Sequence, residues 1–225
     1  MTFLTDFADQ AVIIPVFAVI LGVLGLQRRW RVAASWMLAV VGVLGIVLVL
    51  KVVCYACGWL LPALGPNELA MQSPSGHVGS GAAVYGAAAA LLTGAWQGRR
   101  ARLIALWTAA IVAVVIGITR LQLGAHSLSE VILAAGIGTA GAVGFAVLAG
   151  KRLGQRSGMP PLACALLVVA VTHGHHLPAE AVIQNAASET LRYYVAACQI
   201  ASLPTPTHAS NGSAPEKSVR NRITF

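Results

Sequence analysis

The chain has 225 residues, of which 57% are hydrophobic and only 10% are charged. This composition is too apolar for an ordinary soluble domain and indicates an integral membrane protein. The formal net charge is +8, but the basic residues stand in short clusters between apolar runs, and no basic face interleaved with aromatic residues occurs. A topology signal accounts for this charge, so we expect no nucleic-acid partner.

Five apolar runs have lengths close to the ~20 residues that a helix needs to cross a bilayer. The expected spans cover residues 11–27, 32–50, 78–96, 103–118 and 128–150. Before them, the first ten residues contain Asp6 and Asp9 but no Lys or Arg, unlike the start of a secretory signal peptide, so we expect them to be retained. The sequence therefore predicts an all-α fold, a polytopic membrane bundle with five core helices.

The region after the fifth span gives a weaker pattern. Residues 161–172 are strongly apolar but short, and they run into a histidine-rich stretch at 173–176. We expect a sixth span that reaches about Val182, with an interfacial segment as the alternative. Apolar residues then recur at three- and four-residue spacings, which predicts an amphipathic helix on the membrane surface or against a partner. The expected domains are a transmembrane domain (1–178), this helix (179–200) and a disordered tail (201–225).

The basic clusters predict the orientation of the bundle. They follow the first, third and fifth spans, and they consist of Arg28, Arg29, Arg31, Arg99, Arg100, Arg102, Lys151, Arg152 and Arg156. By the positive-inside rule this side is cytoplasmic. On the opposite side lie the acidic N-terminus and the 51–77 and 119–127 loops, whose only basic residues are Lys51 and Arg120, and these two stand out for that reason. Topology alone brings the following groups to the extracytoplasmic face: Lys51, Ser75, His77, Arg120, His126 and Glu130.

Two short motifs on this face suit phosphate chemistry. The sequence Pro74-Ser75-Gly76-His77 opens a helix of small apolar residues, where backbone N–H groups and the helix dipole can hold an anion. Further on, His126 lies six residues after Arg120 and four residues before Glu130. A nucleophile, a bidentate phosphate ligand and an orienting carboxylate can therefore come from one segment.

These motifs resemble those of the type-2 phosphatidic acid phosphatase superfamily, membrane histidine phosphatases related to the vanadium haloperoxidases. The resemblance covers roughly residues 32–150. Lys51 has the place of the first conserved lysine, but Gly58-Trp59 stand where that motif has Arg-Pro. In the third motif, Thr119 replaces Ser and Glu130 replaces Asp. The second motif is intact.

The resemblance implies a role for each residue. His126 would be the nucleophile that forms a phosphohistidine, His77 would protonate the leaving oxygen, and Glu130 would orient His126. The substrate phosphate would be bound by Lys51, Ser75, Gly76 and Arg120. Such a phosphatase needs neither a metal nor a cofactor. The expected substrate is a lipid phosphate such as phosphatidate, phosphatidylglycerol phosphate or undecaprenyl diphosphate, and the short loops and small size suggest a bacterial inner membrane.

Alternatives remain open from the sequence. Cys54 and Cys57 form a C-x-x-C pair, which could bind zinc together with His173, His175 and His176. The departures at Gly58 and Glu130 would also suit a lipid-phosphate binding or transport protein, or a phosphotransferase with reduced hydrolysis. The sequence indicates no particular oligomeric state, and it does not choose among the lipid phosphates.

Overall fold

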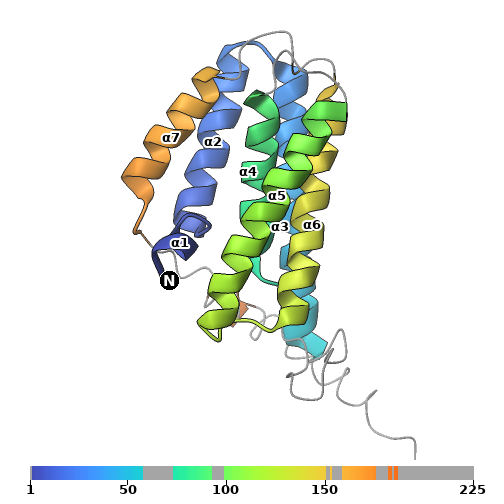
Figure 1. Cartoon of the computed structure of the whole chain (residues 1–225), viewed down its shortest axis with the longest axis vertical. Coiled ribbons are helices and arrows are strands. Elements are labelled where there is room, and N and C mark those ends of the chain that lie inside the picture. The colour runs from blue at the N-terminus through green and yellow to red at the C-terminus, as the bar shows by residue number, and fades with distance from the viewer. Residues whose placement is uncertain are drawn as a thin grey trace, which may run out of the picture.

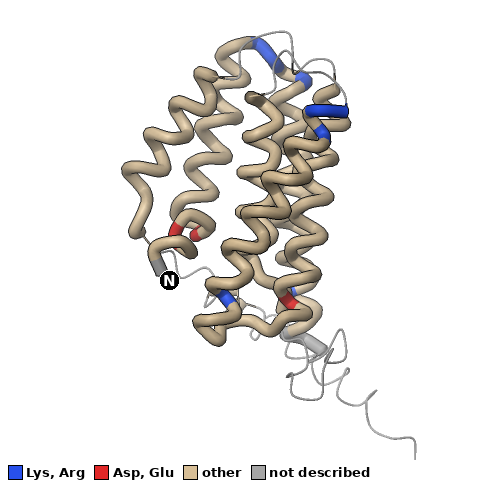
Figure 2. Tube along the Cα trace, viewed as in Figure 1, with Lys and Arg blue, Asp and Glu red and all other residues tan. Residues whose placement is uncertain are grey.

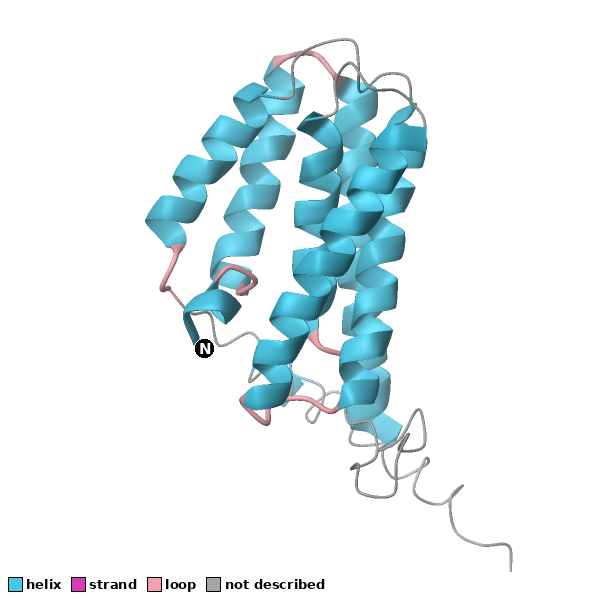
Figure 3. Cartoon of the chain, viewed as in Figure 1, coloured by secondary structure: helices cyan, strands magenta, loops and turns pink. Residues whose placement is uncertain are grey.

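The computed structural model describes residues 2–57, 73–92, 99–150, 153, 159–175, 182–183 and 185–186. Within these residues the chain forms helices and no strands, as Figure 3 shows. The helices are α1 (Thr2–Asp6), α2 (Gln10–Leu26), α3 (Trp30–Cys57), α4 (Gly76–Leu92), α5 (Arg99–Gln122), α6 (Leu128–Ala149) and α7 (Met159–Thr172). The expected all-α bundle is confirmed.

Four helical stretches are long and apolar enough to cross a membrane: Phe3–Leu26, Trp30–Cys54, Arg99–Gln122 and Leu128–Ala149. They correspond to the first, second, fourth and fifth expected spans. The third expected span, 78–96, corresponds to α4, whose 17 described residues are followed by residues 93–98, outside the described part of the chain. The described helices include four candidate spans, so the expected total of five or six spans stays a prediction.

The expected sixth span corresponds to α7, which ends at Thr172 rather than near Val182. Gly174 follows with a φ of +86°, in the left-handed region that commonly ends a helix. Most of the expected amphipathic helix lies outside the described residues, as does all of the 201–225 tail. Within that helix, Val182, Ile183, Asn185 and Ala186 are helical.

Helix α4 occupies the centre of the bundle, with α5 and α6 packed along it and α2 and α3 on its other sides (Figure 1). Its small side chains permit this close packing. A Cβ atom added at Gly86 would lie 2.7 Å from the Cβ atoms of Ala109 and Ala142. A Cβ atom added at Gly138 of α6 would clash with the carbonyl oxygen of Gly79. Larger residues would therefore push the helices apart.

The charges of the described helices divide between the two ends of the bundle (Figure 2). The turn between α2 and α3 and the start of α5 carry basic clusters at one end. At the other end, α3 carries Lys51 near its C-terminus, α5 carries Arg120 in its last turn, and Glu130 lies in the first turn of α6. The two ends differ as the positive-inside pattern predicted.

Candidate active site

The start of α6 brings His126 and Glu130 together. Ser127 is the N-cap residue of α6, so His126 lies one residue before the cap and Glu130 occupies the first turn of the helix. His126 Nδ1 lies 2.8 Å from Glu130 Oε2, and the two side chains are only 7% and 6% exposed. Because a carboxylate accepts hydrogen bonds, Nδ1 carries the proton, and the lone pair of the imidazole lies on Nε2. This is the tautomer that a nucleophilic histidine needs.

Glu130 also connects this segment to the Pro-Ser-Gly-His motif. Its Oε2 accepts a second hydrogen bond, of 3.1 Å, from the backbone N–H of Ser127. Its Oε1 accepts a 2.8 Å hydrogen bond from the backbone N–H of Ser73, one residue before the motif. The backbone carbonyl of Glu130 lies 3.5 Å from the backbone nitrogen of Ser75. The two motifs are therefore joined through one buried residue.

The N-terminus of α4 places Ser75 and Gly76 beside Lys51. The carbonyl of Ser75 accepts the first helical hydrogen bond, from Gly79 N at 3.1 Å. Ser75 is completely buried, and its hydroxyl has no hydrogen-bond partner among the described residues. A Cβ atom built at Gly76 would lie 3.7 Å from Cε of Lys51, which is 3% exposed. A hydroxyl donor and an ammonium group thus lie at a helix N-terminus, a favourable place for an anion.

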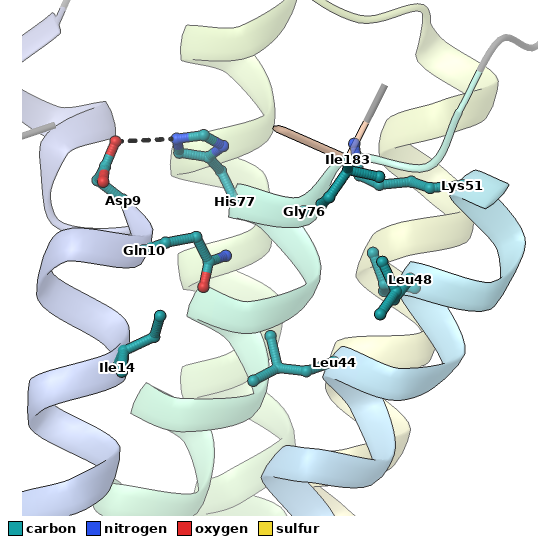
Figure 4. Close-up of a pocket in the computed structure, with 10 residues that line it drawn as sticks. Asp9, Gln10, Ile14, Leu44, Leu48, Lys51, Gly76, His77 and Ile183 are labelled. Carbon is teal, nitrogen blue, oxygen red and sulfur yellow. Dashed lines mark ion pairs between the residues drawn. The ribbon is translucent and has the colours of Figure 1, made fainter. Parts of the chain in front are cut away.

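A cavity of about 300 Å³ opens between α2, α3 and α4 at this end. Its polar lining consists of Asp9, Gln10, Lys51, Gly76 and His77. Its deeper part is apolar and is lined by Ile14, Leu44, Val47 and Leu48, and Ile183 lines it near Lys51 (Figure 4). The cavity is amphipathic, with the polar groups at the end of the bundle and the aliphatic groups further inside.

His77 lies at the start of α4, just before the apolar run that begins at Val78. Its Nε2 lies 3.6 Å from Oδ2 of Asp9, and Figure 4 shows the other ring nitrogen pointing away from Asp9. Burial, together with the positive charge of Arg120, lowers the pKa of His77 from 6.5 to about 4, although the Asp9 carboxylate opposes this shift. His77 is therefore neutral at pH 7.

Arg120 and Thr119 are placed by the last turn of α5. The hydroxyl of Thr119 donates to the carbonyl of Ile116 at 2.7 Å and lies 2.7 Å from the hydroxyl of Thr5. The carbonyl of Arg120 accepts from Ala125 N at 3.1 Å, which shapes the turn that leads to His126. Arg120 and His126 do not line the 300 Å³ cavity in the described part of the chain, although the charge of each bears on His77.

The sequence did not identify Asp9 as a site residue. From the sequence, Asp9 is only one of two acidic residues that argue against a signal peptide. An Asp directly before an apolar helical run is a common N-cap, and here Oδ1 accepts from Ala11 N at 2.8 Å. That signal, combined with the shared face of the bundle, could have placed Asp9 near His77. Gly58 and Trp59, the departures from the first motif, lie outside the described residues.

The zinc alternative finds no support in the described residues, among which no group of three or more His, Cys, Asp and Glu is arranged to hold a metal. His173 instead packs between aromatic rings, with its ring centroid 4.6 Å from Phe3 and 4.3 Å from Phe7. The side chain of Cys57 and all of His176 lie outside the described part.

A larger cavity of about 500 Å³ between α5 and α6 is lined almost entirely by apolar residues and contains none of the predicted site residues.

Comparison with known proteins agrees with the motifs. Residues 62–153 match the PAP2 superfamily. A relative from Klebsiella pneumoniae, named as an uncharacterized 22.5 kDa protein in cps region, is 32% identical over 142 residues, which make up 63% of this chain and 66% of the relative. The aligned part thus spans slightly less than two thirds of that relative. No solved structure matches the chain significantly. The matched segment contains the second and third motifs, and this segment belongs to the PAP2 superfamily.

Proposed function

We propose that the protein is a membrane phosphatase that hydrolyses lipid phosphates through a phosphohistidine at His126, without a metal. Membership of the PAP2 superfamily supports phosphatase activity. The observation that carries the specific mechanism is the 2.8 Å contact between His126 Nδ1 and Glu130 Oε2. This contact leaves Nε2 of His126 as a nucleophile held in one orientation by a buried carboxylate.

In the first step, Nε2 of His126 attacks phosphorus and the bond from phosphorus to the alkoxide oxygen breaks. A proton passes from His77 to that oxygen, so the alcohol leaves in neutral form. His77 must be protonated at this point, although burial and the charge of Arg120 lower its pKa to about 4. A bound phosphate dianion beside the imidazole offsets the charge of Arg120 and raises this pKa again.

In the second step, water attacks the phosphohistidine. His77, now neutral, takes a proton from that water, and His126 Nε2 is released as inorganic phosphate forms. Phosphoryl transfer depends mainly on positioning and on stabilising charge on the phosphate oxygens. We assign that stabilisation to Lys51, to Arg120 and to the hydroxyl and N–H groups of Ser75 and Gly76.

The amphipathic cavity supports a lipid substrate. A phosphate near Lys51 and His77 would place the attached chain towards Leu44, Leu48 and Ile14, which line the inner part of the same cavity. A soluble phosphate ester would leave this apolar surface unused. We therefore favour an apolar ester of phosphate or diphosphate, with phosphatidate, phosphatidylglycerol phosphate and undecaprenyl diphosphate as the substrates to test.

We further propose that the site faces the extracytoplasmic side of a bacterial inner membrane. The basic clusters of the described helices lie at the end of the bundle opposite to His126, which supports this orientation through the positive-inside rule. The similarity to a Klebsiella pneumoniae protein supports a bacterial source.

One observation favours a second candidate, a protein that binds lipid phosphates without turning them over. The pKa of about 4 at His77 means that the group assigned as the acid is unprotonated at neutral pH. If a bound phosphate does not restore the proton, binding would proceed but the alcohol would leave slowly. A phosphotransferase would differ from both, because an acceptor alcohol would replace water in the second step.

The test is phosphate release from a panel of lipid phosphates in detergent with EDTA present, comparing wild type with His126→Ala. We expect turnover that survives EDTA and is lost in the variant, by a factor of at least ~10³, because the covalent route is removed. Binding without turnover in well-folded protein would favour the binding role. Equal turnover by both proteins would rule out His126 as the nucleophile.

A further inference from the structure

The carboxylate of Asp9 contacts both the N-terminus of α2 and the imidazole of His77. Its Oδ1 accepts a hydrogen bond of 2.8 Å from Ala11 N and so caps α2, while its Oδ2 lies 3.6 Å from Nε2 of His77 on α4. Both side chains are largely buried, with exposed fractions of 9% for Asp9 and 21% for His77. At 3.6 Å the contact is an ion-pair distance rather than a short hydrogen bond, so Asp9 acts on the imidazole mainly through its charge.

The N-terminal segment that carries Asp9 is fixed against the core at several points. The hydroxyl of Tyr85 on α4 donates to the carbonyl of Phe7 at 2.6 Å. The hydroxyls of Thr5 and Thr119 are 2.7 Å apart and buried, and Thr119 directly precedes Arg120. Ala8 is completely buried and lies against α4. A Cβ atom added at Gly81 of α4 would lie 3.2 Å from the Cβ atom of Ala8. Asp9 is therefore held beside His77 by the fold and not by its own contact alone.

The other charged groups around His77 oppose its protonation. Arg120 from α5 and His126 from the loop before α6 both favour the neutral imidazole, and Lys51 from α3 lines the same cavity. Among the groups that act on His77, Asp9 is the one that favours the charged form. The ring nitrogen that does not face Asp9 is Nδ1, which points away from Asp9 in Figure 4.

We propose that Asp9 is the positioning residue of His77: through its negative charge the carboxylate favours a proton on the Nε2 that faces it, and so leaves Nδ1, with its own proton in the charged form, for the leaving oxygen. This inference rests on the proposed phosphatase function. When the bond from phosphorus to oxygen breaks, the Nδ1 proton moves to the oxygen and His77 keeps the Nε2 proton facing Asp9. When water attacks the phosphohistidine, Nδ1 recovers a proton from that water. The site then contains two carboxylate–histidine pairs, one for each histidine.

The test uses Asp9→Asn in the full-length protein in detergent. Asn is as good an N-cap as Asp, so α2 keeps its start while the charge next to His77 disappears. Asp6→Asn is the matched control, because it removes the same charge from the same segment and Asp6 is not among the groups that act on His77. The kcat of each protein is measured against pH with dioctanoyl phosphatidate and with para-nitrophenyl phosphate.

We expect Asp9→Asn to lower kcat on phosphatidate by roughly ten- to a hundredfold, a part of the ~10²–10⁴-fold that a general acid contributes. With para-nitrophenyl phosphate the loss should be less than about threefold, because nitrophenolate leaves without a proton. The alkaline limb of kcat should move down by about one pH unit, as expected when a neighbouring negative charge is lost. Asp6→Asn should match wild type.

Equal losses on both substrates with an unmoved pH limb would mean a structural role and would overturn the proposal, as would an Asp9→Asn variant that matches Asp6→Asn. The tautomer of His77 gives a readout that needs no turnover. In ¹⁵N NMR of histidine-labelled protein, assigned with His77→Gln, wild type should show a protonated Nε2 and Asp9→Asn should not. A protein without activity but with this signature would refute the phosphatase and keep the pair, whereas an unchanged spectrum would refute the pair itself.

Discussion

Glu130→Gln tests the central relation of the site, because the substitution keeps the shape of the side chain and removes its charge. The carboxylate accepts hydrogen bonds from three donors: Nδ1 of His126, the backbone N–H of Ser127 and the backbone N–H of Ser73. A glutamine offers one acceptor oxygen and one NH₂ group. If the oxygen stays with Ser73, the NH₂ group faces His126, whose Nδ1 must then become an acceptor.

That change moves the imidazole proton to Nε2 and removes the lone pair that attacks phosphorus. In a Ser-His-Asp triad the corresponding amide lowers kcat by about ten-thousandfold for this reason. We expect a loss of ~10³–10⁴-fold in kcat here, with little change in KM, because the phosphate ligands are untouched. An unsatisfied buried N–H group also costs about 1–3 kcal/mol, so the variant should unfold at a lower temperature.

The assay is single-turnover phosphate release together with a base-stable ³²P label on the protein, which reports phosphohistidine. Glu130→Asp is the matched control, since it keeps the charge and loses one methylene group. We expect this control to retain turnover, with a loss of at most about a hundredfold from mispositioning. If Glu130→Gln forms the labelled intermediate within tenfold of the wild-type rate, the carboxylate does not set the tautomer of His126.

Two further predictions concern pH and packing. The pKa of His77 is about 4 in the folded protein and 6.5 ordinarily, so the unfolded state binds a proton that the folded state rejects. His77 should therefore destabilise the substrate-free fold as pH falls from 6.5 towards 4, by up to about 1.4 kcal/mol per pH unit, and inorganic phosphate should reduce this loss. Thermal unfolding of wild type and His77→Asn measures the effect, and parallel pH profiles for the two proteins would contradict it. Gly86→Ala should cost about 1–3 kcal/mol, because the new Cβ atom would lie 2.7 Å from two alanine Cβ atoms. Gly144→Ala, where nothing lies within 4 Å, should be neutral or stabilising, and similar unfolding temperatures for both variants would refute the packing argument.

The sequence predicted the all-α fold, and it also predicted which residues would share one end of the bundle. Hydropathy delimits long apolar helices, and alternation of loops between two sides then assigns each motif to a side. His126 and Glu130 could be paired because residues four apart lie on one face of a helix turn. For Lys51 and Gly76 the sequence predicts only that both lie on the same side of the membrane. Their contact could not be predicted, because it depends on how α3 and α4 pack.

The contacts that the sequence did not predict join segments far apart in the chain. The N-terminal segment contacts α5 through Thr5 and α4 through Phe7. No local sequence pattern predicts either contact. The only sequence feature that indicates the central position of α4 is its high content of small residues. The end of α7 at Thr172 depends on the left-handed conformation of Gly174, whereas hydropathy alone extended the span to Val182.

The replacement of Asp by Glu at position 130 is explained by the position of Ser73. An aspartate would be one methylene shorter, about 1.5 Å, and its carboxylate would reach either His126 Nδ1 or the backbone N–H of Ser73 without strain, but not both. Glu130 reaches both at 2.8 Å. The longer side chain therefore sets the distance between the His126 segment and the Pro-Ser-Gly-His loop, and these two parts must shift together. For this reason we expect Glu130→Asp to lose rate through the position of the loop rather than through the tautomer of His126.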